Sequence, residues 1–123
     1  MPRLSPHFHS REFETRDGTP IPPRHLYWLG RLCLELLEPA RRIWGPCTVS
    51  SGFRSTEDNA RVGGAPRSLH RRVTHRRGAA ADVVFARGTP AEWHATLDEL
   101  GAQGLGLYVD HVHVDNRARR ARW

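Results

Sequence analysis

The sequence predicts an α+β fold in which a small, largely antiparallel sheet packs against helices. Apolar residues recur at three- and four-residue spacing between Arg24 and Ile43, which is typical of an amphipathic helix. Residues 80–85 and 111–115 are short β-branched runs that favour strands. The expected order along the chain is helix, strand, helix, strand, helix, strand, strand, and this order indicates an α+β domain.

The first half of the chain is expected to form an arm and the main core helix. Residues 1–23 are polar and rich in proline, which favours an extended arm packed on the domain, with one short helical turn starting at Ser10. The core helix should end near Trp44, before Gly45 and Pro46. Its predicted apolar face consists of Leu26, Leu29, Leu32, Cys33, Leu36, Leu37, Ala40 and Ile43.

The second half is expected to supply the sheet and two shorter helices. Residues 47–51 ("CTVSS") and 80–85 ("AADVVF") predict strands, and Ser55 is placed to cap a short helix through Arg61. Pro90 suits the first position of another helix. Residues 104–109 and 111–115 then predict two strands joined by a tight hairpin near Asp110.

Length and charge limit the possible functions. A chain of 123 residues predicts a single domain, residues 1–123. Its formal charge of +6 comes from arginine alone, since the sequence has no lysine, and such a surface attracts polyanions. The N-terminal residues lack the apolar core of a signal peptide, and no run approaches the ~20 apolar residues of a membrane span. We therefore expect no membrane partner and no export signal. We also expect a monomer.

The cysteines, the tryptophans and the basic segments are interpreted as structural rather than functional. Cys33 and Cys47 are too few for a disulfide framework and are interpreted as small buried apolar groups. The basic segments at 67–77 and 117–122 are expected to be solvated faces. The tryptophans are expected to be core anchors, and they are Trp28, Trp44, Trp93 and Trp123.

Side-chain alternation places polar groups on one face of two predicted strands. In "HVHVD" His111, His113 and Asp115 share one face, whereas the valines between them share the other. In "AADVVF" Asp82 lies on the face opposite Ala81 and Val83. A carboxylate in a half-buried strand needs a partner, and either a metal ion or an arginine would serve.

A zinc ion suits the residue types near these strands. Zinc is held by histidine nitrogens and carboxylates, and a catalytic site uses three protein ligands with one open position. His75, Asp82 and His113 would supply that set. Magnesium and calcium prefer oxygen ligands and fit less well.

These residues belong to a longer set of motifs with a resemblance to a known family. Residues 75–82 read as HxxGxAxD and residues 113–115 as HVD. With "LSPHF", "EF", "VSSGFRS", "NARVGGAP", "GLGLY" and the closing "ARW", the chain resembles the zinc D-Ala-D-Ala carboxypeptidase family, which has the DD-peptidase or Hedgehog-type fold. The resemblance spans nearly the whole chain.

The resemblance implies a zinc metallopeptidase acting on peptidoglycan stem peptides, with His75, Asp82 and His113 as ligands. It implies that Asp110, three residues before the last ligand, is the general base, and this requires a bend between Asp110 and His113. Arg54 would grip a terminal substrate carboxylate.

Two more residues near the predicted ligands are expected to assist the reaction or the metal. His111 would donate a hydrogen bond to the developing oxyanion. Asp115 would hold the free ring N–H of a ligand histidine.

The first half of the zinc motif departs from the family pattern. The family has serine two residues before the first histidine, where this chain has Val73, and a serine–histidine pair occurs earlier as Ser68 and His70. Either His75 is the ligand with Ser68 displaced from its usual place near the substrate, or His70 is the ligand across a longer loop. The six-residue spacing to Asp82 favours His75.

Other interpretations of the same residues remain open. Asp82 could pair with an arginine, Asp110 could cap the hairpin turn and Arg54 could hold a loop. A zinc-binding module without catalysis is one alternative function. A basic nucleic-acid-binding protein is another, although no aromatic residues interleave the basic run and no specific nucleic acid is expected. By resemblance, a cell-wall enzyme without an export signal is typical of phage relatives that are made in the cytoplasm and act after lysis or within a virion.

Overall fold

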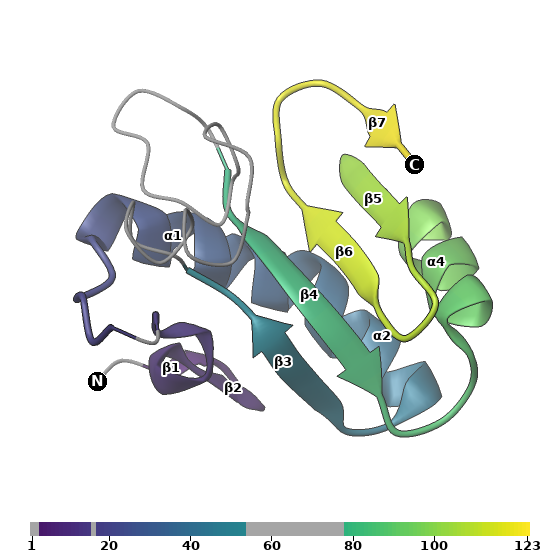
Figure 1. Cartoon of the computed structure of the whole chain (residues 1–123), viewed down its shortest axis with the longest axis horizontal. Coiled ribbons are helices and arrows are strands. Elements are labelled where there is room, and N and C mark those ends of the chain that lie inside the picture. The colour runs from purple at the N-terminus through teal and green to yellow at the C-terminus, as the bar shows by residue number, and fades with distance from the viewer. Residues whose placement is uncertain (1–2, 16, 54–77) are drawn as a thin grey trace.

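A five-stranded sheet in the order β3-β4-β6-β5-β7 forms the centre of the structure (Figure 1). The computed structural model describes residues 3–15, 17–53 and 78–123. The strands are β3 (Cys47–Ser51), β4 (Ala80–Phe85), β5 (Gly104–Leu107), β6 (Val112–Asp115) and β7 (Ala121–Arg122). Neighbouring strands are antiparallel except that β7 runs parallel to β5. The predicted α+β class with a largely antiparallel sheet is confirmed.

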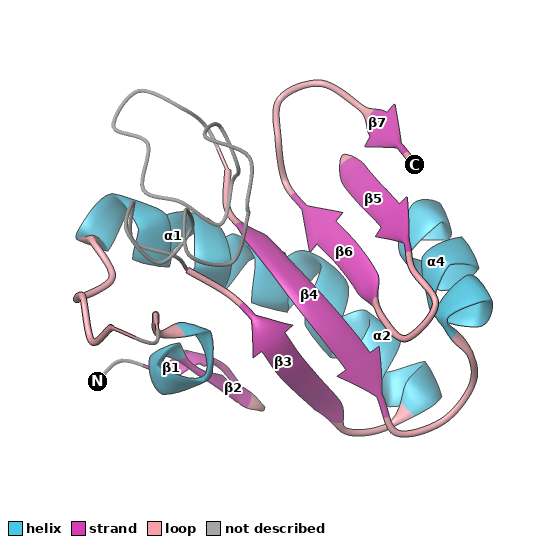
Figure 2. Ribbon diagram, viewed as in Figure 1, coloured by secondary structure: helices cyan, strands magenta, loops and turns pink. Residues whose placement is uncertain are grey.

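The described helices between β2 (Phe8–His9) and β5, apart from the N-terminal turn at Ser10–Phe13, lie on one face of this sheet, behind it in the view of Figure 2. They are α1 (Pro23–Leu32), the π-helical turn η2 (Cys33–Leu37), α2 (Glu38–Trp44) and α4 (Pro90–Glu99). Alternation along each strand directs Ala81 and Val83 of β4, and Val112 and Val114 of β6, into the core between sheet and helices, where all four are fully buried. The opposite face of the same strands is therefore available for polar side chains.

The predicted core helix is present but contains an unpredicted π-helical turn. Pro39 has no N–H and its ring would collide with the carbonyl of Glu35 in a regular α-helix. The wider turn that precedes it is closed by a bond from the Glu38 N–H to the Cys33 carbonyl. This turn holds one residue more than an α-helical turn, so the residues after it face different directions from those that a regular helix predicts. Glu38 is therefore buried, whereas Ile43, which was expected on the core face, is 52% exposed.

The N-terminal arm is more regular than expected. Residues Arg3–Ser5 (β1) and Phe8–His9 (β2) form a small antiparallel ribbon, and Ser10–Phe13 (η1) forms the predicted helical turn as a 3₁₀ helix. His9 rather than Ser10 caps this turn. Phe8 and Phe13 are buried in the core.

A buried carboxylate joins this arm to the core helix. Glu38 accepts hydrogen bonds from Ser5 Oγ at 2.6 Å and from the His7 N–H at 2.7 Å, and its Oε1 lies 2.7 Å from His7 Nδ1. The proline-rich arm is therefore fixed to the core helix at Glu38.

Helix α4 begins as predicted at Pro90, with Thr89 as its N-cap. The predicted helix at Ser55–Arg61 lies outside the described residues. Within the described part of the chain, no helix is long and apolar enough to cross a membrane. Cys33 and Cys47 are both free. Cys33 is buried as expected, whereas Cys47, also expected to be buried, is only partly buried.

Candidate functional site

Two of the three predicted zinc ligands are direct neighbours across the sheet. Asp82 in β4 is the register partner of His113 in β6. Residues that oppose one another in antiparallel strands project from the same face, and both side chains lie on the face opposite the valine core. His113 Nδ1 is 3.1 Å from Asp82 Oδ1. The alternation prediction is thus confirmed for these two residues.

The second nitrogen of His113 is held by Asp115. Nε2 donates to Asp115 Oδ2 at 2.8 Å, and His113 is only 9% exposed. Because an ionised carboxylate only accepts hydrogen bonds, Asp115 keeps a proton on Nε2 and leaves Nδ1 as the nitrogen that faces Asp82. Burial lowers the pKa of His113, but its hydrogen bonds with Asp115 and Asp82 outweigh burial and raise it above the usual value.

Asp115 is in turn held by Arg117. Its side chain is fully buried, and Arg117 grips it in a forked pair, with Nε 2.8 Å from Oδ1 and Nη2 2.6 Å from Oδ2. Burial alone would raise the pKa of Asp115, but His113 and Arg117 hold it well below its usual range. A Cβ at Gly104, the register partner of Asp115, would collide with this carboxylate. Glycine at position 104 therefore makes room for the support of His113.

This arrangement fits a zinc ion in donor chemistry. A histidine nitrogen with its opposite N–H fixed by a carboxylate is the usual form of a metal-bound histidine, and Asp82 places a carboxylate oxygen beside it. In the described ranges 3–15, 17–53 and 78–123, no group of three His, Cys, Asp or Glu side chains forms a metal cluster. The third ligand would be His75, with His70 as the alternative, and both lie outside these ranges.

Asp110 and His111 lie in the turn that joins β5 to β6. The Tyr108 N–H donates to the His111 carbonyl at 3.1 Å and closes this turn, so the chain bends between Asp110 and His113. Asp110 is 86% exposed in its side chain, and its Oδ1 lies 2.7 Å from His111 Nδ1. The hydrogen bond from His111 lowers the pKa of Asp110. The carboxylate is therefore ionised at neutral pH.

Arg54 and Ser68, the predicted substrate-binding residues, lie outside the described residues. Their roles stay predictions, as do the general-base role of Asp110 and the oxyanion role of His111.

The sequence did not indicate two residues that complete the surroundings of His113. The tail 117–122 was expected to be a solvated face, yet Arg117 pairs with buried Asp115 and Arg122 donates to the carbonyls of Ala102 and Gln103. Trp123, expected as a core anchor, is instead 44% exposed, and its ring centroid lies 5.0 Å from that of His113. The spacing of Asp115 and Arg117 was the one available signal, because i, i+2 residues share a face of an extended chain.

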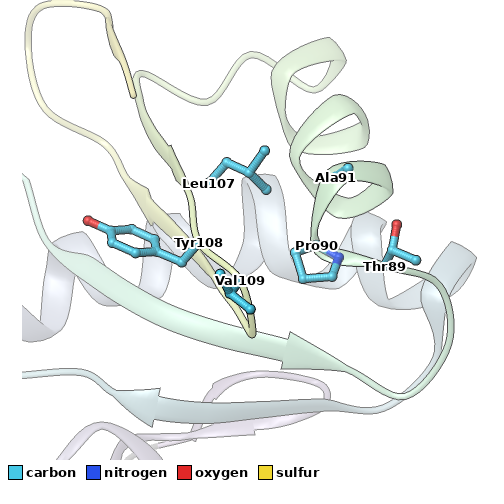
Figure 3. Close-up of a pocket in the computed structure, with 6 residues that line it drawn as sticks. All are labelled: Thr89, Pro90, Ala91, Leu107, Tyr108 and Val109. Atoms are coloured by element: carbon cyan, nitrogen blue, oxygen red, sulfur yellow. The ribbon is translucent and has the colours of Figure 1, made fainter.

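A shallow apolar depression of about 580 Å³ lies beside the same turn. Figure 3 shows Leu107 and Val109 on one side of it and Pro90 and Ala91, at the start of α4, on the other. The ring of Tyr108 extends away from the α4 residues in this view. The turn thus presents Leu107 and Val109, an apolar side, toward α4.

Comparison with known proteins identifies the family. No curated protein and no solved structure matches the chain significantly. The family model described as Peptidase M15 matches residues 8–115, which include Asp82, Asp110 and His113. Since this match covers most of the chain, and the sheet brings two expected metal ligands together within it, the protein belongs to the peptidase M15 family of metallopeptidases.

Proposed function

We propose that the protein is a zinc metallopeptidase that hydrolyses peptidoglycan stem peptides in the manner of a D-Ala-D-Ala carboxypeptidase. The observation that carries the proposal is the arrangement of His113, whose Nδ1 faces Asp82 while its Nε2 is fixed by buried Asp115. Glycine at position 104 leaves the room that this supporting carboxylate occupies. Membership of the M15 family supports the same reaction class.

The chain would hold the metal through His75, Asp82 and His113. Zinc, when bound, lowers the pKa of a coordinated water toward ~7 and polarises the scissile carbonyl. Asp115 keeps His113 in the required tautomer and orientation, and Arg117 keeps Asp115 ionised. Asp82 adds negative charge that favours a divalent cation over an empty site.

Proton transfer is assigned to Asp110. Its exposed carboxylate accepts the proton of the attacking water and later delivers it to the leaving amine. His111 Nδ1 faces the Asp110 carboxylate and donates to it, so Nε2 would donate to the oxyanion that develops on the carbonyl only when the ring is doubly protonated. Both residues are carried by one short turn, which fixes their relative positions.

Substrate recognition is assigned to residues outside the described ranges. Arg54 would bind a terminal carboxylate through two parallel hydrogen bonds, and Ser68 would contact the peptide. The net charge of +6 favours approach to an anionic cell wall. We propose that the protein acts there as a monomer, without a specific nucleic-acid or membrane partner.

The proposal is tested by mass spectrometry of purified muropeptides incubated with the protein, with and without chelator. We expect loss of one or more stem-peptide residues, abolition of this product by chelator and its restoration by Zn²⁺. Asp82→Ala should remove the product, whereas Asp98→Ala, which removes a carboxylate bonded to Arg120 and Arg122, should not.

Two other outcomes would replace the proposal. One equivalent of bound zinc with no product would indicate an inactive metal-binding module. Salt-dependent binding to DNA with no product would indicate the nucleic-acid function.

A further inference from the structure

We propose that Trp123 is a positioning residue, whose indole ties the candidate ligand His113 to the turn that carries Asp110. The inference rests on the function proposed above for this site. It concerns a side chain to which neither the family match nor the zinc chemistry assigns a role. The family match ends at residue 115.

The backbone of Trp123 is fixed independently of its side chain. Its N–H donates to the Leu105 carbonyl at 3.0 Å, and its carbonyl accepts from the Leu107 N–H at 2.7 Å. The preceding Arg122 donates to Ala102 O at 2.7 Å and to Asp98 Oδ1 at 2.9 Å. Strand β7 is therefore held on β5 by the backbone and by Arg122, and replacing the indole should leave this attachment intact.

One side of the indole contacts the support of the candidate ligand. Its ring centroid lies 5.0 Å from that of His113, and the Arg117 guanidinium lies 5.1 Å from the indole ring. A Cβ at Gly106, the register partner of His113, would collide with Trp123 Nε1. Glycine at position 106 thus lets the indole lie over this row of the sheet, next to His113.

The indole N–H reaches the turn. Nε1 donates to the Tyr108 hydroxyl at 2.9 Å. The Tyr108 ring stacks on His111, with centroids 4.4 Å apart and planes 7° apart. His111 in turn pairs with Asp110 at 2.7 Å. A continuous set of contacts therefore runs from His113 through Trp123 and Tyr108 to Asp110.

This set has a catalytic consequence because Asp110 lies on an exposed turn. General-base catalysis needs the carboxylate at hydrogen-bond distance from the attacking water, and small misplacements of reacting groups lower rates steeply. The indole N–H holds the turn relative to His113. Its loss should lower kcat and leave KM and zinc affinity nearly unchanged, since the ring that packs on His113 remains in a phenylalanine variant.

The experiment compares Trp123→Phe, Tyr108→Phe and the double variant with wild type in the full chain. The matched control is Trp44→Phe, because Trp44 Nε1 donates to Thr96 Oγ1 at the same 2.9 Å between α2 and α4, away from the site. Three quantities are measured: kcat and KM on the muropeptide that wild type converts, Zn²⁺ affinity by chelator competition, and hydrogen exchange of the Tyr108 amide in zinc-loaded protein.

We expect both single variants to lower kcat about three- to tenfold, as loss of one hydrogen bond implies, and the double variant to add nothing. Tyr108 amide exchange should rise by a similar factor in all three, and Trp44→Phe should change neither quantity. Independent, multiplying effects of the two substitutions would overturn the proposal. A raised KM with unchanged kcat would also overturn it and would make the indole a substrate platform.

Failure of the proposed function is distinguishable from failure of this inference. If wild type converts no muropeptide, the peptidase proposal fails and amide exchange alone decides the inference. Unchanged exchange in Trp123→Phe and Tyr108→Phe refutes the coupling whether or not the protein is active.

Discussion

Replacing Asp115 by asparagine tests the support of His113 most directly. The substitution keeps the side-chain volume but removes the negative charge between His113 and Arg117. Asp115 is fully buried and accepts from Arg117 at 2.6 and 2.8 Å and from His113 at 2.8 Å. Breaking a buried ion pair by changing one partner costs about 3–5 kcal/mol, because the remaining charge stays buried without compensation.

The loss of stability in Asp115→Asn depends on whether Arg117 and His113 can move toward water once the carboxylate is gone. Arg117 is partly exposed and can turn toward water, whereas His113 cannot. We therefore expect a loss near the lower limit, about 3 kcal/mol in the free energy of unfolding of the metal-free protein. Zinc affinity should fall about 10- to 100-fold, as it does when the partner of a ligand histidine is lost.

Urea denaturation in chelator measures the first quantity, and chelator competition measures the second. Asp98→Asn is the control, because Asp98 also pairs with two arginines but is half-exposed and belongs to helix α4, outside the set formed by Asp82, His113 and Asp115. It should lower stability only slightly and leave zinc affinity unchanged. If Asp115→Asn matches this control in both measurements, the carboxylate does not support the ligand and the reasoning is refuted.

Three further predictions concern the site and the fold. Asp82→Asn should reduce calorimetric zinc binding by at least tenfold, since it removes a charged ligand; unchanged affinity would exclude Asp82 from the site. Ser5 and His7 hold the pKa of Glu38 below its usual value despite burial, which raises it. The Glu38 carboxylate therefore contributes its full stabilisation above the unfolded pKa of about 4.3, and this stabilisation is lost as pH falls through the lower folded pKa. Glu38→Gln should therefore weaken the dependence on pH, in this acid range, of the free energy of unfolding measured with urea. A pH dependence parallel to that of wild type would contradict this. Gly104→Ala should weaken zinc binding, because the added Cβ displaces Asp115. Gly30→Ala is the control: Gly30 has open space around it in α1, so this variant should stabilise the fold by about 0.5–1 kcal/mol. If the two variants change the thermal unfolding temperature and the zinc affinity equally, the role of Gly104 is refuted.

The sequence predicted the elements whose signals are local and repeated. The limits of β4 and the start of α4 follow from alternation and from Pro90. The same alternation placed Asp82 opposite Ala81 and Val83 in one strand and His113 opposite the valines of the other, but it did not predict that these two strands pair with Asp82 beside His113. Strand β7 was not predicted because two residues carry no pattern, and it forms only through backbone bonds to β5.

The support of His113 was only partly predictable for a related reason. Asp115 could be assigned by general knowledge of metal-bound histidines, and its contact with His113 is confirmed. Arg117 was expected at a solvated face because basic tails are usually exposed, and Trp123 was expected in the core because tryptophan side chains are usually buried. Their actual contacts depend on the path of the chain back to β5, which no local pattern encodes.

The pairing of β4 with β6 ties the competence of the site to correct strand assembly. A slip of one residue between these strands would turn Asp82 toward the valine layer and separate it from His113. Chains trapped in such a misaligned state would lose both the apolar packing and the cation-binding pair together. Metal uptake by this protein should therefore report on the fidelity of its folding, and zinc added during refolding should favour the chains whose strands have paired correctly.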